Sequence, residues 1–294
     1  CVGTSIGCGL ISYKRAVILV SVFVLLGALV DGSHVMETVG SGIINQPLDY
    51  LAIFVALFCS GFFVTLATFF RIPTSTSQAI VGGVLGIGLA TGADIQYSKL
   101  ITIAESWVLC PLLVMALSYA FYSLLSRFLK RLRAGALTIQ QTLGYCSIMS
   151  ACYLSYSMGA NNAGNAVGPI ANLGVVHPQL LLLLGGLSIA VGAITYGKKV
   201  ADTVGKKITP LDSIGAFSAQ MSSAAGMHLF SLLGIPVSTS TAIVGAIVGV
   251  GLVKGARSIS KHTVLTILGG WVLTPTLAAV ASLVMYKIIN SFLL

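Results

Sequence analysis

Two short segments of this 294-residue chain place three hydroxyl side chains in a row shortly after a proline. The hydroxyl residues are Ser75, Thr76, Ser77, Ser238, Thr239 and Ser240. Each triplet opens a Gly-rich apolar run, 75–89 or 238–253, which predicts a short helix with unpaired N–H groups in its first turn. A helix cap accounts for one Ser or Thr but not for three, and an oxyanion offers several acceptors at once. The pattern therefore predicts an oxyanion site at each of two helix N-termini.

A second polar segment, 159–168, contains three glycines and the side-chain amides of Asn161, Asn162 and Asn165. Their amide oxygens suit a hard cation such as sodium, and their N–H groups suit an anion. We expect the backbone here to be unwound and to line a cavity between two helices. The alternative is a surface loop with ordinary Asn and Gly turn chemistry.

The composition shows what kind of protein must position these groups. Hydrophobic residues make up 56% of the chain and charged residues only 8%, against roughly 25% charged in soluble domains. This excludes a soluble globular protein and predicts an all-α polytopic membrane protein. The net charge of +9 is then a signal of membrane topology and not of nucleic-acid binding. The six cysteines lack metal-ligand spacing, and we expect them to be packing residues.

Long apolar runs predict the remaining helices. They cover residues 16–30, 48–70, 100–125, 137–157, 180–196, 213–233 and 263–289.

The chain contains an internal duplication, because 72–89 matches 235–252 at an offset of 163 residues. We assign 1–125 to a first repeat, 126–137 to a basic linker and 138–294 to a second repeat. Residues 31–47 carry acidic but no basic residues, whereas the matched 197–212 carries four lysines. Because basic loops stay cytoplasmic, the repeats are predicted to have inverted topology with broken or re-entrant helices and a cytoplasmic linker. Glycines at 82, 86, 245 and 249 predict close helix packing.

On these motifs the chain resembles the inorganic phosphate transporters of the PiT family, over both repeats. That family carries a Gly-Ala-Asn-Asp-x-x-Asn-Ala signature in each repeat, similar to the segment at 159–166, and Ser-Thr-Ser segments at the spacing found here. The resemblance implies a symporter that moves inorganic phosphate with sodium or protons by alternating access. It also implies a multi-pass protein of the plasma membrane, a homodimer, and neither enzyme activity nor an organic cofactor.

The resemblance also suggests roles for the polar residues. Phosphate would bind to the two hydroxyl triplets and Asn162, and the coupling cation to Asn161, Asn162 and Asn165. The family's usual Asp is Asn162 here, which removes a negative charge from the cation site and leaves the coupling ion open. Sulfate or another tetrahedral oxyanion is the alternative substrate. A first copy of the signature would precede Cys1, so we expect the sequence to be a piece of a longer chain.

Two further patterns are weighed against this assignment. Gly3-Thr-Ser-Ile-Gly7 fits the hydrolase pattern Gly-x-Ser-x-Gly, but no strand signal precedes it, so an intramembrane serine hydrolase is a remote alternative. The four histidines show no metal-ligand spacing and are expected to lie in loops or near helix ends. None of them is assigned to a site.

Overall fold

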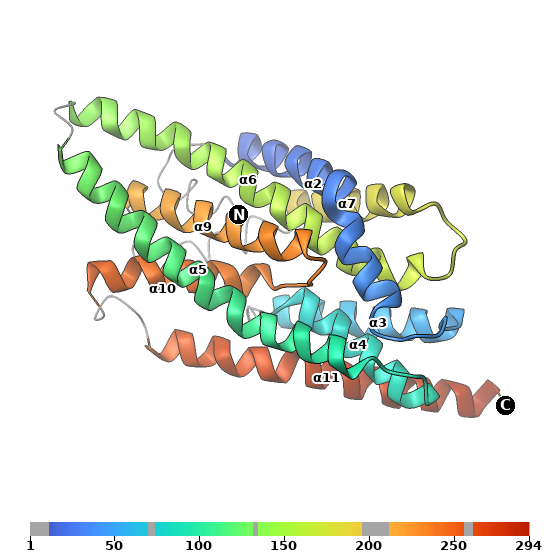
Figure 1. Ribbon diagram of the computed structural model, residues 1–294. Coiled ribbons are helices and arrows are strands. Elements are labelled where there is room, and N and C mark those ends of the chain that lie inside the picture. The colour runs from blue at the N-terminus through green and yellow to red at the C-terminus, as the bar shows by residue number, and fades with distance from the viewer. Residues whose placement is uncertain (1–11, 70–73, 132–134, 196–211, 256–260, 294) are drawn as a thin grey trace.

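The computed structural model describes residues 12–69, 74–131, 135–195, 212–255 and 261–293. These residues form long, closely packed helices with short connections (Figure 1). The helices are α2 (Tyr13–Ser41), α3 (Tyr50–Phe69), α4 (Thr76–Thr91), α5 (Tyr97–Arg131), α6 (Ala136–Ala171), α7 (Pro178–Thr195), α9 (Ser213–Leu232), α10 (Thr239–Lys254) and α11 (Lys261–Leu293). Among the described residues the β-structure is a single bridge between Ile44 and Ile95. The prediction of an all-α protein is confirmed.

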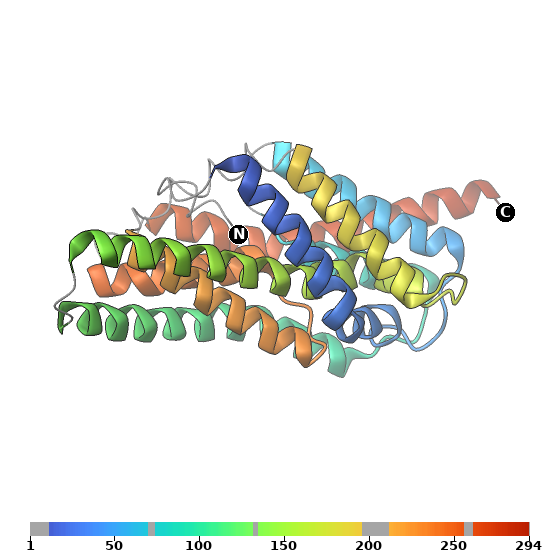
Figure 2. The ribbon, with the colours of Figure 1, turned by 90° about the horizontal axis from the view of Figure 1, so that it is seen from above.

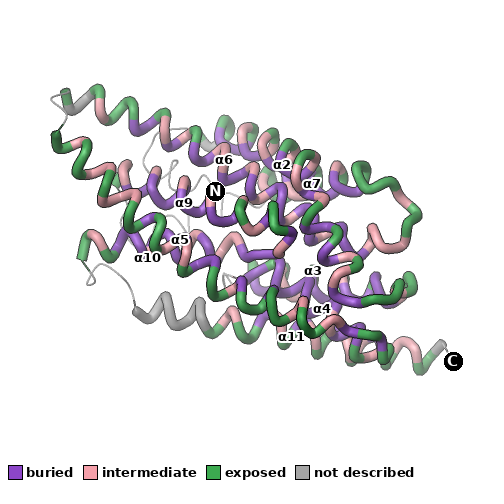
Figure 3. The backbone as a smooth tube through the Cα atoms, viewed as in Figure 1, coloured by how far each residue is buried: buried purple, intermediate pink, exposed green. Residues whose placement is uncertain are grey.

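Five helices of the described part are long and apolar enough to cross a membrane. These segments are Lys14–Ser41, Tyr50–Phe69, Tyr97–Arg131, Pro178–Thr195 and Gly269–Phe292. Their outer faces are apolar, as shown by the exposed and stacked rings of Phe54, Phe58 and Phe62 on α3. The shorter helices α4 and α10 are instead buried over most of their length (Figure 3).

Helices α4 and α10 are each held between two long helices. Helix α4 packs against α3 and α11, and α10 packs against α9 and α5. A Cβ on Gly82 of α4 would overlap the carbonyl oxygen of Pro275, and one on Gly245 of α10 would overlap that of Pro111. The predicted close packing at these glycines is confirmed, and its partner is in each case a helix from the other half of the chain.

The predicted break at 159–168 is wrong, because α6 continues through it as far as Ala171. Its glycines allow α2 to approach instead: a Cβ on Gly159 would overlap the carbonyl oxygen of Val24, and one on Gly164 would lie 2.5 Å from that of Gly32. Small residues therefore serve helix contact here and leave the backbone hydrogen bonds of α6 in place.

Residues 31–47, which the charge comparison treats as a loop after the helix predicted at 16–30, are also largely helical, since α2 extends to Ser41. Helix α2 lies beside α7 (Figure 2), with Gly32 facing the side chain of Leu182. Its predicted counterpart, 197–212, lies outside the described residues except for Asp212. Residues 126–131 of the predicted linker continue α5.

Candidate functional site

The first serine of each triplet is a helix cap. Ser75 precedes α4 and accepts a hydrogen bond from the N–H of Gln78 at 3.2 Å. Ser238 precedes α10 and accepts from the N–H of Thr241, also at 3.2 Å. Both caps have extended backbone dihedrals and are buried. The capping alternative is therefore correct for one residue in each triplet and leaves two residues for other roles.

The third serines join the two helix tips. The hydroxyl of Ser77 donates to the carbonyl oxygen of Val237 at 2.7 Å, and that of Ser240 donates to the carbonyl oxygen of Thr74 at 3.2 Å. Each tip thus binds the segment that leads into the other tip. From this junction α4 and α10 extend in opposite directions (Figure 1). Two positive helix ends consequently meet at one place, which favours a negative ligand there.

The three asparagines of α6 contact both tips. Asn161 Nδ2 donates to the carbonyl oxygen of Val237 at 2.9 Å, and Asn162 Nδ2 donates to the hydroxyl of Thr239 at 3.0 Å. Asn165 Nδ2 reaches the hydroxyl of Ser77 at 2.9 Å and Asn161 Oδ1 at 2.7 Å. The structure therefore brings the asparagines together with both hydroxyl triplets, although they lie 70 to 90 residues apart in the sequence.

The predicted site residues differ in their access to a ligand. Ser75, Ser77, Ser238, Asn161 and Asn165 are buried. Thr76, by contrast, is exposed. The remaining members are half-buried: Thr239, Ser240 and Asn162. The hydroxyls of Thr76, Thr239 and Ser240 and the amide of Asn162 are thus at least partly accessible, while the buried members bond to one another or to nearby backbone groups.

Two buried amide oxygens lack a hydrogen-bond partner among the described residues: Asn165 Oδ1 and Gln78 Oε1. An unpaired buried carbonyl oxygen is costly, and a hard cation is one partner that would satisfy it. Sequence reasoning overlooked Gln78, although a polar residue directly after the triplet in an apolar run was the available signal. The described residues contain no group of three or more His, Cys, Asp or Glu side chains able to hold a metal. The hydrolase-like segment, 3–7, lies outside the described residues.

Comparison with known proteins agrees with this architecture. The model of the phosphate transporter family matches residues 1–282. A protein of Pyrococcus furiosus described as a phosphate permease is 30% identical to this chain, and the match covers 97% of this chain and 89% of the relative. The chloroplast inorganic phosphate transporter 2-1 of Arabidopsis thaliana is 26% identical, with 98% of this chain and 69% of the relative covered.

A solved structure has the same fold. It is described as the sodium-dependent phosphate transporter, is 27% identical in sequence and superposes with a TM-score of 0.89. The match covers 99% of this chain and 93% of that chain.

Proposed function

Because this chain belongs to the phosphate transporter family, we propose that it is a symporter that moves inorganic phosphate together with sodium or protons. Family members are transporters and permeases, so the chain is a membrane transport protein and not an enzyme. The description of the solved relative as sodium-dependent supports sodium as the coupling ion.

The junction of the two helix tips carries this proposal. We place phosphate between the triplets Ser75–Ser77 and Ser238–Ser240, where Asn162 adds an amide donor. Phosphate would receive hydrogen bonds from hydroxyl and N–H groups at two positive helix ends, and such donors need no net charge of their own. Its remaining proton needs an acceptor, which the amide oxygen of Asn162 supplies.

The hydrogen bonds between the two helix tips are compatible with transport by alternating access. The tips are joined by side-chain hydroxyls that donate to backbone carbonyls, at Ser77 to Val237 and at Ser240 to Thr74. The oxygens of a phosphate ion can take over these hydroxyl donors, so ligand binding would exchange one set of hydrogen bonds for another. One half of the molecule could then move against the other without leaving buried donors unpaired.

We place the coupling cation at Asn161, Asn162 and Asn165. Asn165 Oδ1 is buried and has no described partner, and Asn161 Oδ1 lies 2.7 Å from the Asn165 amide nitrogen. A sodium ion would need that amide to rotate so that both oxygens face it. The bound anion would supply the negative charge that the family's Asp contributes elsewhere.

We further propose two inverted repeats, 1–125 and 138–294, joined by a cytoplasmic basic linker at 126–137 in a homodimer of the plasma membrane. The opposite directions of α4 and α10 from their junction support the inversion (Figure 1).

The test is uptake of radiolabelled phosphate into proteoliposomes that contain the full-length protein, with and without an inward sodium gradient. We expect sodium to stimulate uptake and excess sulfate to leave it unchanged. The combined variant Ser238→Ala, Thr239→Ala and Ser240→Ala should insert normally and lose uptake, whereas Thr65→Ala, which removes an exposed hydroxyl on α3, should keep it. Uptake that sulfate blocks would favour the alternative oxyanion, and full uptake by the triple variant would refute the site.

A further inference from the structure

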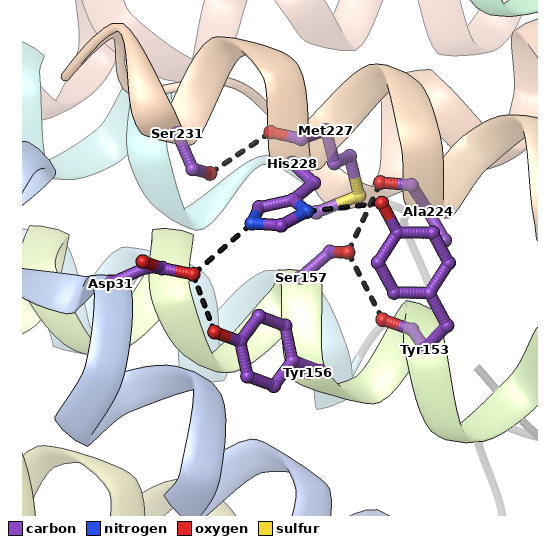
Figure 4. A network of polar contacts seen from close by, with 8 residues as sticks. All are labelled: Asp31, Tyr153, Tyr156, Ser157, Ala224, Met227, His228 and Ser231. Carbon is purple, nitrogen blue, oxygen red and sulfur yellow. Dashed lines mark hydrogen bonds and ion pairs between the residues drawn. The ribbon is translucent and has the colours of Figure 1, made fainter.

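A network of ionisable side chains joins three helices close to the asparagines of α6. His228 of α9 points its Nε2 at Asp31 Oδ2 of α2 over 3.1 Å, and its Nδ1 lies 3.0 Å from the hydroxyl of Tyr153 (Figure 4). The hydroxyl of Tyr156 donates to the same oxygen of Asp31. The rings of Tyr153 and Tyr156 both contact the imidazole edge to face.

The network can gain or lose a proton while its heavy atoms stay in place. With neutral His228, the Nε2–H donates to Asp31 and the hydroxyl of Tyr153 donates to Nδ1. With protonated His228, both ring nitrogens donate, and the Tyr153 hydroxyl becomes the acceptor. The imidazolium form is therefore accommodated by the rotation of one hydroxyl hydrogen.

Protonation changes the charge of this network. The pair of Asp31 and neutral His228 carries one negative charge, and a proton on the imidazole brings the pair to zero. The two side chains are only 16% and 21% exposed, so water screens this charge poorly. Tyr156 precedes Asn161 by five residues of α6, an axial rise of about 7.5 Å. The charge therefore lies near the place where the proposed function puts the anion.

Other charged groups around α9 are remote or exposed. Asp212 caps the N-terminus of α9, sixteen residues before His228. It forms an ion pair with Lys254 of α10 at 2.9 Å and accepts a hydrogen bond from the Tyr122 hydroxyl of α5. On α2, His34 and Glu37 lie near Asp31 but are exposed.

We propose that His228 and Asp31 form a proton-binding site whose occupation strengthens phosphate binding at the helix tips. This inference rests on the proposed function. Removing one negative charge at about 10 Å, with an effective dielectric constant near 20, strengthens binding of a monoanion by about tenfold. By linkage, phosphate binding then promotes proton uptake at His228 to the same degree.

Two substitutions test the proposal because they act in opposite directions. His228→Gln leaves the Asp31 charge uncompensated at every pH, so phosphate affinity should fall about tenfold at about pH 5 and remain unchanged at about pH 8. Asp31→Asn removes the charge at every pH, so affinity at about pH 8 should rise about tenfold. Loss of a merely structural contact would weaken both variants alike. His34→Gln, an exposed histidine one turn along α2, should follow the wild type throughout.

Equilibrium binding of radiolabelled phosphate by the full chain in detergent measures these affinities, and all variants experience the same phosphate species at each pH. The imidazole ¹⁵N signal that disappears in His228→Gln reports the proton directly, without phosphate. A His228 signal that does not change between about pH 5 and 8, or equal losses in the two variants, would overturn the proposal. A His228 that titrates in a chain that binds no phosphate would instead count against the proposed function.

Discussion

The two helix tips are built from the same sequence and differ in how they are held. At the α4 tip, Ser77 is buried and its oxygen takes part in two hydrogen bonds, to Val237 and from Asn165. At the α10 tip, Ser240 is half-buried, makes its cross-junction bond over 3.2 Å, and has its second bond to the Ser238 hydroxyl of its own tip at 2.9 Å. The hydrogen bond from Ser240 to Thr74 is therefore weaker than the one from Ser77 to Val237.

Helix α6 contacts the two tips unequally. Its asparagines bind the α10 side at Val237 and Thr239, but the α4 side only at Ser77. The polar residue that follows each triplet differs as well: Gln78 leaves its amide oxygen unpaired, whereas the Thr241 hydroxyl bonds back to the carbonyl of Ser238. The two equivalent tips therefore differ residue by residue: the third serine is buried at the α4 tip and half-buried at the α10 tip, whereas the second hydroxyl residue is exposed at Thr76 and half-buried at Thr239.

The largest effect is expected where the tips are alike. Gly82→Leu and Gly245→Leu should each destabilise the protein by about 3 kcal/mol or more, because the new side chain meets backbone of α11 or α5 that cannot yield. Thermal unfolding in detergent measures this. Gly61→Leu on α3 is the control, because nothing lies within 4 Å of its added Cβ. If one tip tolerated leucine, the packing of the tips would not be equivalent.

Glycines in this chain also show which structural features the sequence predicts and which it does not. Hydropathy located every described helix, and the duplication identified the tips, because both signals are local or repeated. The break at 159–168 was predicted wrongly because Gly159 and Gly164 look the same whether they unwind a helix or admit a neighbour. Only the position of α2 decides, and the partners of Asn161 lie far away in the sequence. His228 was passed over for the same reason, since its partner Asp31 is 197 residues distant.

The next largest effect is a difference in stability loss between alanine variants of the third serine at each tip. Ser77→Ala should cost about 1–3 kcal/mol, because it removes a buried donor to Val237 and a buried acceptor for Asn165. Ser240→Ala should cost less, about 0.5–1 kcal/mol, because its oxygen is half-buried and its bond to Thr74 is longer. Unfolding midpoints of the two variants give the comparison. Equal losses would mean that the difference in burial has no energetic consequence.

Asn162 of α6 contacts the α10 tip through the hydroxyl of Thr239. Asn162→Asp should raise the sodium stimulation of phosphate uptake on the order of tenfold, because a carboxylate adds a negative charge to the proposed cation site. It should also remain compatible with the tip, since a carboxylate can accept a hydrogen bond from the Thr239 hydroxyl in place of the present bond. Uptake at several sodium concentrations provides the measurement. Unchanged sodium dependence would place the cation elsewhere.

The smallest effect concerns two tryptophans, of which Trp107 contacts the segment that leads to the α10 tip. Trp107 Nε1 donates to the carbonyl oxygen of Pro236 at 3.2 Å and so holds the segment leading to α10. Trp271 begins the segment Trp-Val-Leu-Thr-Pro, which matches Trp-Val-Leu-Cys-Pro at 107–111, and it has a buried Nε1 without a partner among the described residues. Phenylalanine removes the N–H and a similar part of the ring at both positions. Trp107→Phe should therefore cost about 0.5–1.5 kcal/mol more than Trp271→Phe in thermal unfolding, because only the first change leaves a carbonyl without its donor. A cost as large at Trp271 would show that ring packing, and not this hydrogen bond, fixes the approach to the tips.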